Sequence, residues 1–413
     1  MAALERVFER VETLREEAVR LQAEMTSRVA LGPENGGTGE HEKAAFLKGR
    51  LEALGPDAVD EIRAPDERAH EGYRPNLVAR WSGAQDGPTI WVLSHMDIVP
   101  PGDRSLWNTD PYRVEVRGDR IYGRGVEDNQ HGIVSSILGL QAVLDEGAGP
   151  ALPVGLVFVA DEETGSRYGL DYLLRHREDL FDPKDLIIVP DGGNDRGTMI
   201  EVAEKSMLWL KFTVQGRQCH ASTPHKGRNS LVAAARLILA LEGLRADFPA
   251  SDPLFSPPRS TFEPTKMEAN VPNVNTIPGK DVFYLDCRIL PNYSTDEVFD
   301  ACERIARQVE EITETSVTLE KSYRQEAPDP TPPDAPVVRA LASAVGRVTG
   351  REARPMGIGG GTVAAFFRRA GFPAAVWSTV SDTAHQPNEY CRISTLLSDA
   401  KVFACLFLEG TAG

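Results

Sequence analysis

The sequence predicts an α/β protein, with a mixed sheet covered by helices on both faces and a smaller α+β domain inserted into it. Three continuous apolar runs of strand length predict the sheet, because each is rich in β-branched residues and ends at polar residues. They cover residues 89–93, 154–160 and 186–189. Helical segments separate these runs, and such alternation is typical of α/β folds. A chain of 413 residues, 41% of them hydrophobic, is also long enough for two domains.

The alternation changes near Lys205 and returns after a proline-rich linker at residues 327–336. We therefore expect a discontinuous first domain, residues 1–205 and 322–413, and an inserted domain, residues 206–321. In chain order, apolar periodicity predicts the remaining elements of the first domain. They are helices at 2–24, 44–54, 132–144, 337–348, 362–370 and 393–408, strands at 76–81 and 374–377, and a hairpin at 112–125 that turns at Gly118-Asp119. The inserted domain should hold strands at 207–215, 282–290 and 317–319, and helices at 231–244 and 295–312.

Composition argues against several classes of partner. The 61 acidic and 45 basic residues give a formal charge of −16, which disfavours binding to nucleic acid or to an anionic membrane. Residues 1–22 lack the apolar segment of a signal peptide, and no apolar run approaches the roughly 20 residues that a membrane span needs. The five cysteines include no C-x-x-C motif and fit free thiols in a reducing compartment. We therefore expect a cytoplasmic protein.

Acidic residues and histidines follow several of the predicted strands. Since the carboxyl ends of parallel strands meet at one edge of a sheet, these side chains should converge although they span most of the chain. Asp128 precedes a predicted helix, and His385 lies in a polar loop after the last strand. The converging set is His95, Asp97, Asp128, Glu162, Glu163, Asp191 and His385.

Divalent cations are the physical reason to bring such side chains together, because carboxylates alone would repel one another. Nitrogen and oxygen ligands suit zinc, with manganese or cobalt as alternatives. One shared carboxylate would give a pair of ions about 3.5–4 Å apart. Each motif alone has a simpler interpretation: His95-x-Asp97 also fits a surface histidine near a turn, and Glu162-Glu163 a solvated acidic loop. In the metal interpretation, one glutamate binds an ion and the other accepts the proton of water.

Together, these motifs resemble the metallopeptidase family of aminoacylase, carboxypeptidase G, acetylornithine deacetylase and succinyl-diaminopimelate desuccinylase. The resemblance covers nearly the whole chain in the same order and includes the inserted domain. It implies a zinc-peptidase-like catalytic domain with an inserted lid and dimerisation domain. It also implies that His95, Asp128 and Asp191 hold one zinc, and that Asp128, Glu163 and His385 hold the other. The motifs are residues 94–97, 125–128, 161–163 and 190–191, with the late His385.

The resemblance assigns further roles. Asp97 would orient His95, and Glu162 would be the general base. His220, in the motif at residues 216–220, would reach the active site of the partner subunit of a homodimer and stabilise the oxyanion. From the residues alone, His220 is better interpreted as a hydrogen-bonded surface histidine, and Cys219 as a packing residue.

Substrate contacts would come from Asn275, Arg288, Gly360 and Gly361, which match substrate-binding positions of the family. An arginine can hold a carboxylate with two hydrogen bonds, and backbone N–H groups of a glycine-rich loop can cradle one. Two segments depart from the family pattern: residues 129–131 after the bridging aspartate, and residues 363–365 after the glycine-rich loop. Both put membership of the desuccinylase subgroup in doubt.

These observations lead to a functional hypothesis with three alternatives. The hypothesis is a dizinc amidohydrolase that cleaves the amide bond of an N-acyl amino acid or short peptide. A dipeptidase or carboxypeptidase of the same family is the first alternative, and a non-catalytic protein that binds amino acids or peptides is the second. A serine hydrolase is disfavoured because the sequence contains no G-x-S-x-G motif.

Overall fold

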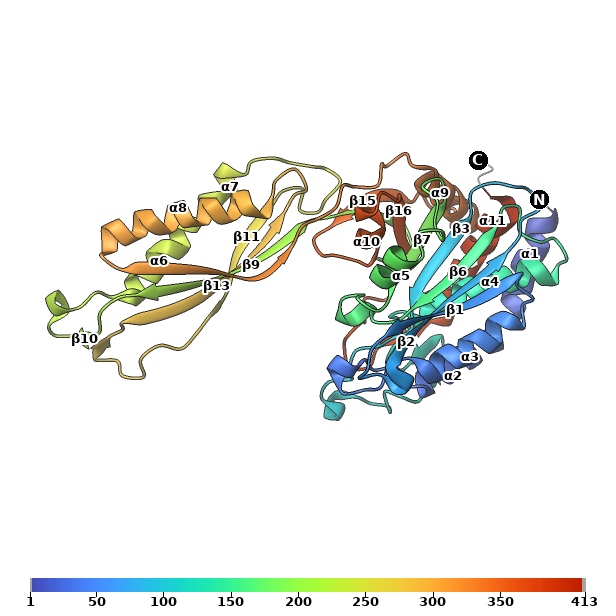
Figure 1. Ribbon diagram of the computed structural model, residues 1–413, viewed down its shortest axis with the longest axis horizontal. Coiled ribbons are helices and arrows are strands. Elements are labelled where there is room, and N and C mark those ends of the chain that lie inside the picture. The colour runs from blue at the N-terminus through green and yellow to red at the C-terminus, as the bar shows by residue number, and fades with distance from the viewer. Residues whose placement is uncertain (1, 411–413) are drawn as a thin grey trace. The chain divides into compact units, whose positions relative to one another are not determined.

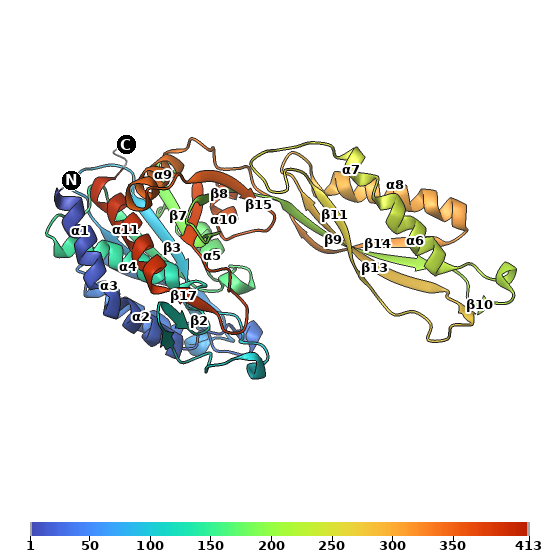
Figure 2. The ribbon, with the colours of Figure 1, turned by 180° about the vertical axis from the view of Figure 1, so that it is seen from behind.

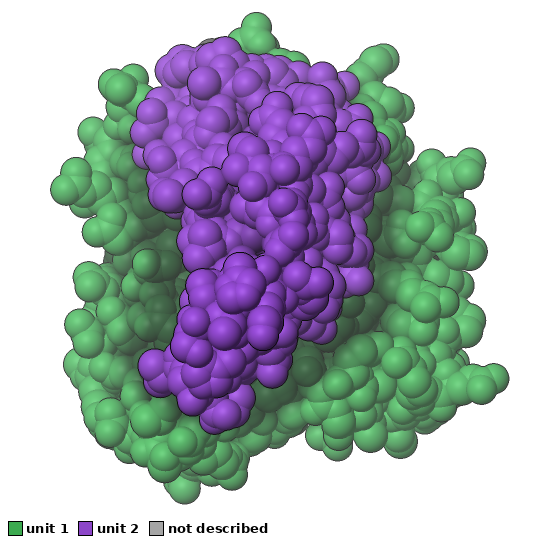
Figure 3. Space-filling model, turned by 90° about the vertical axis from the view of Figure 1, so that its left-hand side faces the viewer, with its two compact units in different colours: residues 1–202, 331–356, 362–413 green, residues 203–330, 357–361 purple. Residues whose placement is uncertain are grey.

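The structure, a computed structural model, describes residues 2–410 and divides the chain into two compact units. Unit 1 comprises residues up to 202, residues 331–356 and residues from 362 on, and unit 2 comprises residues 203–330 and 357–361 (Figure 3). The sequence placed the domain boundaries at 205/206 and 321/322, whereas the units change at 202/203 and 330/331. The glycine-rich segment Gly357–Gly361 therefore belongs to unit 2, although the residues on both sides of it belong to unit 1.

Unit 1 is built on an eight-stranded mixed sheet with the order β1-β2-β6-β3-β7-β16-β8-β15. Four neighbouring strands, β6, β3, β7 and β16, run parallel. Strand β2 pairs antiparallel with β1 and β6, and β8 pairs antiparallel with β16. The strands are β1 (Ala58–Pro65), β2 (Tyr73–Trp81), β3 (Ile90–His95), β6 (Val154–Val159), β7 (Leu186–Asn194), β8 (Met199–Glu204), β15 (Arg354–Ile358) and β16 (Ala374–Thr379).

Helices cover both faces of this sheet (Figures 1 and 2). Helices α5 and α10 contribute to an apolar cluster on one face, and α4 packs against α11 on the other. Gly139 permits the close approach of α4 and α11, since a Cβ atom there would lie 2.6 Å from the carbonyl oxygen of Ala400. The helices of unit 1 are α1 (Ala2–Thr13), α2 (Arg15–Ser27), α3 (His41–Glu52), α4 (Gln130–Asp145), α5 (Leu170–His176), α9 (Pro336–Thr349), α10 (Ala364–Arg369) and α11 (Ile393–Glu409).

The predicted fold class is confirmed, but some predicted elements are wrong in detail. The single helix expected at 2–24 is two helices, interrupted at Leu14, whose N–H donates to the carbonyl of Val11. Strand β1 was not predicted because it is a half-buried edge strand with charged residues and no apolar run. The predicted hairpin is present as β4 (Glu115–Arg117) and β5 (Arg120–Tyr122), with β17 (Tyr390–Arg392) added beside β5.

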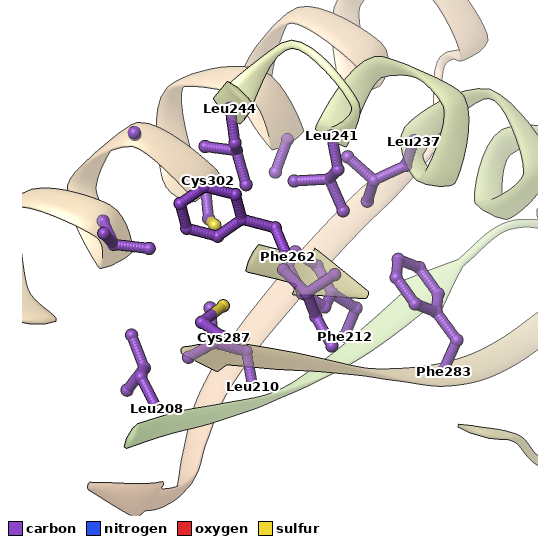
Figure 4. Close-up of a cluster of buried hydrophobic side chains, with 14 of the residues drawn as sticks. Leu208, Leu210, Phe212, Leu237, Leu241, Leu244, Phe262, Phe283, Cys287 and Cys302 are labelled. Atoms are coloured by element: carbon purple, nitrogen blue, oxygen red, sulfur yellow. The ribbon is translucent and has the colours of Figure 1, made fainter. Parts of the chain in front are cut away.

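Unit 2 has a four-stranded antiparallel sheet, with the order β11-β13-β9-β14, and helices packed on one face of it. Its core is a cluster of apolar side chains between the sheet and helices α6, α7 and α8 (Figure 4). A capping box begins α8: Ser294 accepts from the N–H of Glu297, and the Glu297 carboxylate accepts from the N–H of Ser294. The elements are β9 (Ser206–Gln215), β10 (Cys219–His220), α6 (Ser230–Leu241), α7 (Leu244–Asp247), β11 (Thr261–Met267), β12 (Thr276–Ile277), β13 (Lys280–Ile289), α8 (Thr295–Thr313) and β14 (Ser316–Gln325).

Short 3₁₀ helices occupy several connections, at Pro33–Asn35, His70–Gly72, Arg104–Leu106, Glu162–Thr164 and Pro224–Lys226. Within residues 2–410, no helix is both long and apolar enough to span a membrane.

Candidate metal centre

The residues predicted to bind metal lie together at one edge of the unit 1 sheet, where the parallel strands have their carboxyl ends. Each is placed by a different connection. His95 ends β3, Asp191 lies within β7, Asp128 precedes α4, Glu162 and Glu163 form the 3₁₀ helix after β6, and His385 lies in the loop between β16 and β17. The apolar strands therefore fix the places from which these polar side chains project.

Asp128 lies at the centre of the cluster. Its Oδ1 atom is 2.8 Å from His95 Nε2, and its Oδ2 atom is 3.1 Å from His385 Nε2. The two oxygens thus face two different histidines, which is the arrangement of a carboxylate that bridges two positions. His95 Nε2 also lies 3.6 Å from Asp191 Oδ1, and His385 Nε2 lies 3.1 Å from Glu163 Oε2.

The donor atoms are close enough to surround divalent cations. One set of ligand atoms within 4.8 Å of one another comes from His95, Glu162 and Asp191, and a second comes from His95, Asp128 and Glu163. His385 is not in either set, but its contacts place it beside Asp128 and Glu163. Imidazole nitrogens and carboxylate oxygens suit zinc, manganese and cobalt. The residues present therefore fit a divalent metal.

The charges in this cluster shift its protonation equilibria. Burial, with the nearby charge of Asp191, raises the pKa of Glu162 well above its usual range. Burial raises the pKa of Asp191 to about 6. Hydrogen bonds with Asp128 and Glu163 raise the pKa of His385 to about 10. Without a metal, protons thus balance part of the converged negative charge; a metal ion has to displace the protons on its own ligands.

Asp97 connects the end of β3 to the segment that carries both glutamates. Its carboxylate accepts from the backbone N–H groups of Glu162, at 3.1 Å, and Glu163, at 3.0 Å. His95 Nδ1 lies 3.1 Å from the Asp97 carbonyl oxygen and 3.4 Å from Asp97 Oδ1. A proton on Nδ1 would suit both contacts and leave Nε2 of His95 free to bind a metal.

Two buried cations that the sequence did not single out support the same region. The Arg74 guanidinium binds the Glu40 carboxylate, with Nε 2.7 Å from Oε2, and lies 3.6 Å from Asp161, the residue before Glu162. The Lys43 ammonium donates to the carbonyl of Met96 at 2.8 Å. Both side chains come from segments with no motif, so burial in the structure was needed to find them.

The other predicted site residues all belong to unit 2, where they form two groups. His220 in β10 pairs with Thr276 in β12, next to the exposed Asn275, and its Nδ1 atom accepts from the Ser222 N–H at 3.1 Å. The Arg288 guanidinium makes two hydrogen bonds with Asp286, at 2.7 and 3.0 Å, and a third with the Gly359 carbonyl at 2.9 Å.

Arg288 therefore lies beside the glycine-rich loop, although Asp286 already occupies one edge of its guanidinium. Gly360 has open space on its Cβ side, whereas a Cβ atom on Gly361 would meet the side chain of Gln325.

Comparison with known proteins decides the family. Residues 91–409 match the family described as peptidase family M20/M25/M40. The chain belongs to this family. It is accordingly a metallohydrolase that acts on amide or peptide bonds, as the sequence motifs indicated, and the family implies a divalent metal.

Individual relatives agree with this assignment. An uncharacterised metallohydrolase of Methanococcus maripaludis is 40% identical over 414 residues, which cover 95% of this chain and 99% of the relative. A succinyl-diaminopimelate desuccinylase of Gluconobacter oxydans is 28% identical and covers 89% of this chain and 91% of the relative. The crystal structure of human carnosine dipeptidase 1 shares the fold, with a TM-score of 0.73 at 18% identity over 99% of this chain and 98% of that chain.

Proposed function

We propose that this member of the family is a two-metal amidohydrolase that cleaves the amide bond of an N-acyl amino acid or short peptide. The observation that carries the proposal is the meeting of two histidines and two further carboxylates, Glu163 and Asp191, around Asp128, with Glu162 beside them. His95, Asp128 and Asp191 would hold one ion, and Asp128, Glu163 and His385 the other. Zinc suits these ligands, and manganese or cobalt could replace it.

Glu162 is the proposed general base. When bound, a pair of divalent cations would acidify a water molecule and polarise the scissile carbonyl group. Glu162 would accept the proton of that water and then donate it to the nitrogen of the leaving amine. Its burial supports this role, because burial raises the pKa of Glu162 above its usual range. Positive charge close to the carboxylate would lower the pKa of Glu162 again, towards the working pH. Asp97 would keep both glutamates and His95 in place through the contacts described above.

Substrate binding is proposed for unit 2. Arg288 and the N–H groups of Gly360 and Gly361 would hold the free carboxylate of the substrate, because Arg288 already lies against the loop through Gly359. Asn275 would contact the substrate, and His220 would donate to the oxyanion.

We also propose that the protein is a cytoplasmic homodimer. Helix α6 exposes Leu231, Val232 and Leu239 to 42%, 48% and 67%, an apolar face that a second copy of unit 2 would cover. The cytoplasmic location is supported by the five cysteines, which are all free thiols, as a reducing compartment would leave them. Light scattering should show a dimer for the native chain and a monomer for Leu239→Glu; a native monomer would contradict the proposal.

A dipeptidase or carboxypeptidase remains the alternative, favoured by the two departures from the desuccinylase pattern. The segments that differ are Asn129–His131 and Val363–Ala365. A turnover screen with acetyl and succinyl amino acids, dipeptides and longer peptides separates these activities. A non-catalytic binding protein would bind members of the panel without converting any of them.

The variant Glu162→Gln tests the proposal directly. Turnover should fall by about 10²–10⁴-fold because the proton acceptor is lost, while the metal content stays that of the native protein. Glu115→Gln, on an exposed strand of unit 1, is the matched control and should leave turnover unchanged. A Glu162→Gln protein with near-native turnover would show that another residue is the base.

A further inference from the structure

Asp128 stands between two residues whose buried side chains hold different parts of the site. Glu127 is 6% exposed and Asn129 is 2% exposed, although both are polar. Their hydrogen bonds run to opposite sides of Asp128: those of Glu127 to the loop that carries His385, and those of Asn129 to the segments that carry His95 and Asp191.

Glu127 holds the start of the His385 loop. Its carboxylate accepts from the backbone N–H groups of Ser381 and Thr383, the latter at 2.6 Å, and from the Thr383 hydroxyl at 2.7 Å. The carboxylate thus receives three donors from one short segment of the loop. Such a segment would lose most of its anchorage if the carboxylate were replaced by a group that also donates.

The loop needs outside support because its backbone is unfavourable. Asp382, His385 and Asn388 all have positive φ angles, of 60°, 63° and 61°. Non-glycine residues hold this conformation at a cost that the surrounding structure has to cover. His385 itself is exposed over 55% of its side chain, so packing contributes little to its position.

The connection between the loop and the Asp128 segment is reciprocal. Glu389, at the far end of the loop, accepts from the N–H groups of Gly125, Glu127 and Asp128 at 3.1, 3.0 and 3.2 Å. Its carboxylate also binds the Arg124 guanidinium at 2.6 Å. Each segment therefore sends one buried glutamate to the backbone of the other.

Asn129 holds the opposite side of the site. Its Oδ1 atom accepts from the N–H of His95 at 3.3 Å, and its Nδ2 group donates to the Pro190 carbonyl at 2.5 Å and to Asp191 Oδ1 at 3.0 Å. Only an amide offers an acceptor and two donors in one planar group. An aspartate here would place an oxygen against the Pro190 carbonyl and the Asp191 carboxylate.

We infer that Glu127 and Asn129 are positioning residues, each serving one of the two metal positions that share Asp128. Glu127 places His385 and thereby serves the position of Asp128, Glu163 and His385. Asn129 places Asp191 and the end of β3 and thereby serves the position of His95, Asp128 and Asp191. This inference rests on the proposed two-metal function and adds a division of labour within Glu127-Asp128-Asn129.

Competition titration with zinc or cobalt against a chelator tests the inference through metal affinity. Glu127→Gln and Asn129→Asp should each weaken one of the two binding steps by about 10–100-fold, the range found when partners of metal ligands are lost. In a His385→Ala background, Glu127→Gln should add little, because that position is already damaged, whereas Asn129→Asp should weaken the remaining ion. Thr383→Val removes one donor to Glu127 and the hydrogen bonds of the Thr383 hydroxyl with the Tyr390 backbone, and should weaken the same binding step as Glu127→Gln.

The controls separate this inference from the proposed function. Glu115→Gln should leave both binding steps unchanged, and chemical unfolding in a chelator should show that each variant is folded. If the native protein binds two ions but both variants weaken both steps equally, or neither step, the inference is wrong and the proposed function stands. If the native protein does not bind two ions, the proposed function itself fails.

Discussion

The interiors of the two units differ in kind. The core of unit 2 consists of leucine, phenylalanine, valine, alanine, isoleucine and cysteine side chains between a sheet and its helices (Figure 4). Unit 1 has apolar clusters as well, but among the described residues it also holds most of the buried charged side chains, including Glu40, Arg74, His95, Glu127 and Glu389.

The difference distinguishes the apolar core, which stabilises the protein, from the buried charges, which the proposed activity requires. Burial of apolar side chains stabilises the folded chain through the surface area removed from water and through close packing. The side chains in the core of unit 2 therefore need only to fill that core well. Buried charges gain little net stability and are costly when one partner is lost. Under the proposed function, the site in unit 1 would keep them because metal binding and proton transfer need them, at some expense of stability.

Of the variants that test this comparison, Phe283→Ala should have the largest effect. Phe283 is buried in the unit 2 core and stacks on Phe212, with ring centroids 4.7 Å apart. The substitution should lower the free energy of unfolding by about 3–5 kcal/mol through lost burial and a cavity. Urea unfolding measures this loss. Metal content of the folded variant should stay native, since every proposed ligand belongs to unit 1; metal loss without unfolding would break the comparison.

Arg74→Met makes the corresponding test in unit 1. Arg74 and Glu40 are both fully buried and paired, so the variant would leave the Glu40 carboxylate buried without its cation. We expect a loss of about 3–5 kcal/mol, at most equal to that of Phe283→Ala. The double variant Arg74→Met/Glu40→Leu should recover part of that stability in urea unfolding, because it removes the unpaired Glu40 carboxylate, whereas buried Asp161 still loses the cation 3.6 Å away. Failure of the second substitution to recover any would show that the pair matters by shape and not by charge.

A substitution of His41 should have the smallest effect on the free energy of unfolding, and that effect should depend on pH. Burial, with the charge of His70, lowers the pKa of His41 below its usual 6.5, although Glu71 and Glu61 oppose the shift. The unfolded chain therefore binds a proton here more readily than the folded chain, and stability falls as the pH drops through about 6.5.

The His41→Gln variant should lose less stability than the native protein between pH 8 and pH 5.5, as measured by urea unfolding at each pH. An identical pH dependence in both proteins would mean that His41 titrates alike in the folded and unfolded chains.

Much of the fold followed from the sequence because apolar periodicity reports burial. Strands β3, β6 and β7 are continuous apolar runs, and the sequence located them within a few residues, although β7 continues beyond Asp191 to Asn194. Strands β1, β8, β11 and β15 were not predicted, and neither were the very short strands β10, β12 and β17. The three strands β1, β11 and β15 lie at sheet edges, where one side of the strand is unpaired and polar residues are tolerated.

Only some residues of the candidate site could be predicted from the sequence. His95 and Asp191 could be found because their chemistry stands out after apolar strands, and Asp128 because it lies in a polar motif just before a predicted helix. The residues that hold them could not. Glu127 and Glu389 resemble any surface glutamate in the sequence, and only the backbone groups that they contact, far away in the chain, show what they do.

Metal content per chain tests the central claim most directly. The native protein, equilibrated with zinc or cobalt and freed of unbound ions, should hold two ions per chain, since Asp128 presents one oxygen to each histidine. The Asp128→Ala protein should bind no ion at either position with native affinity, and it should lose turnover. A native protein without bound ions, or an Asp128→Ala protein that keeps both, would contradict the account.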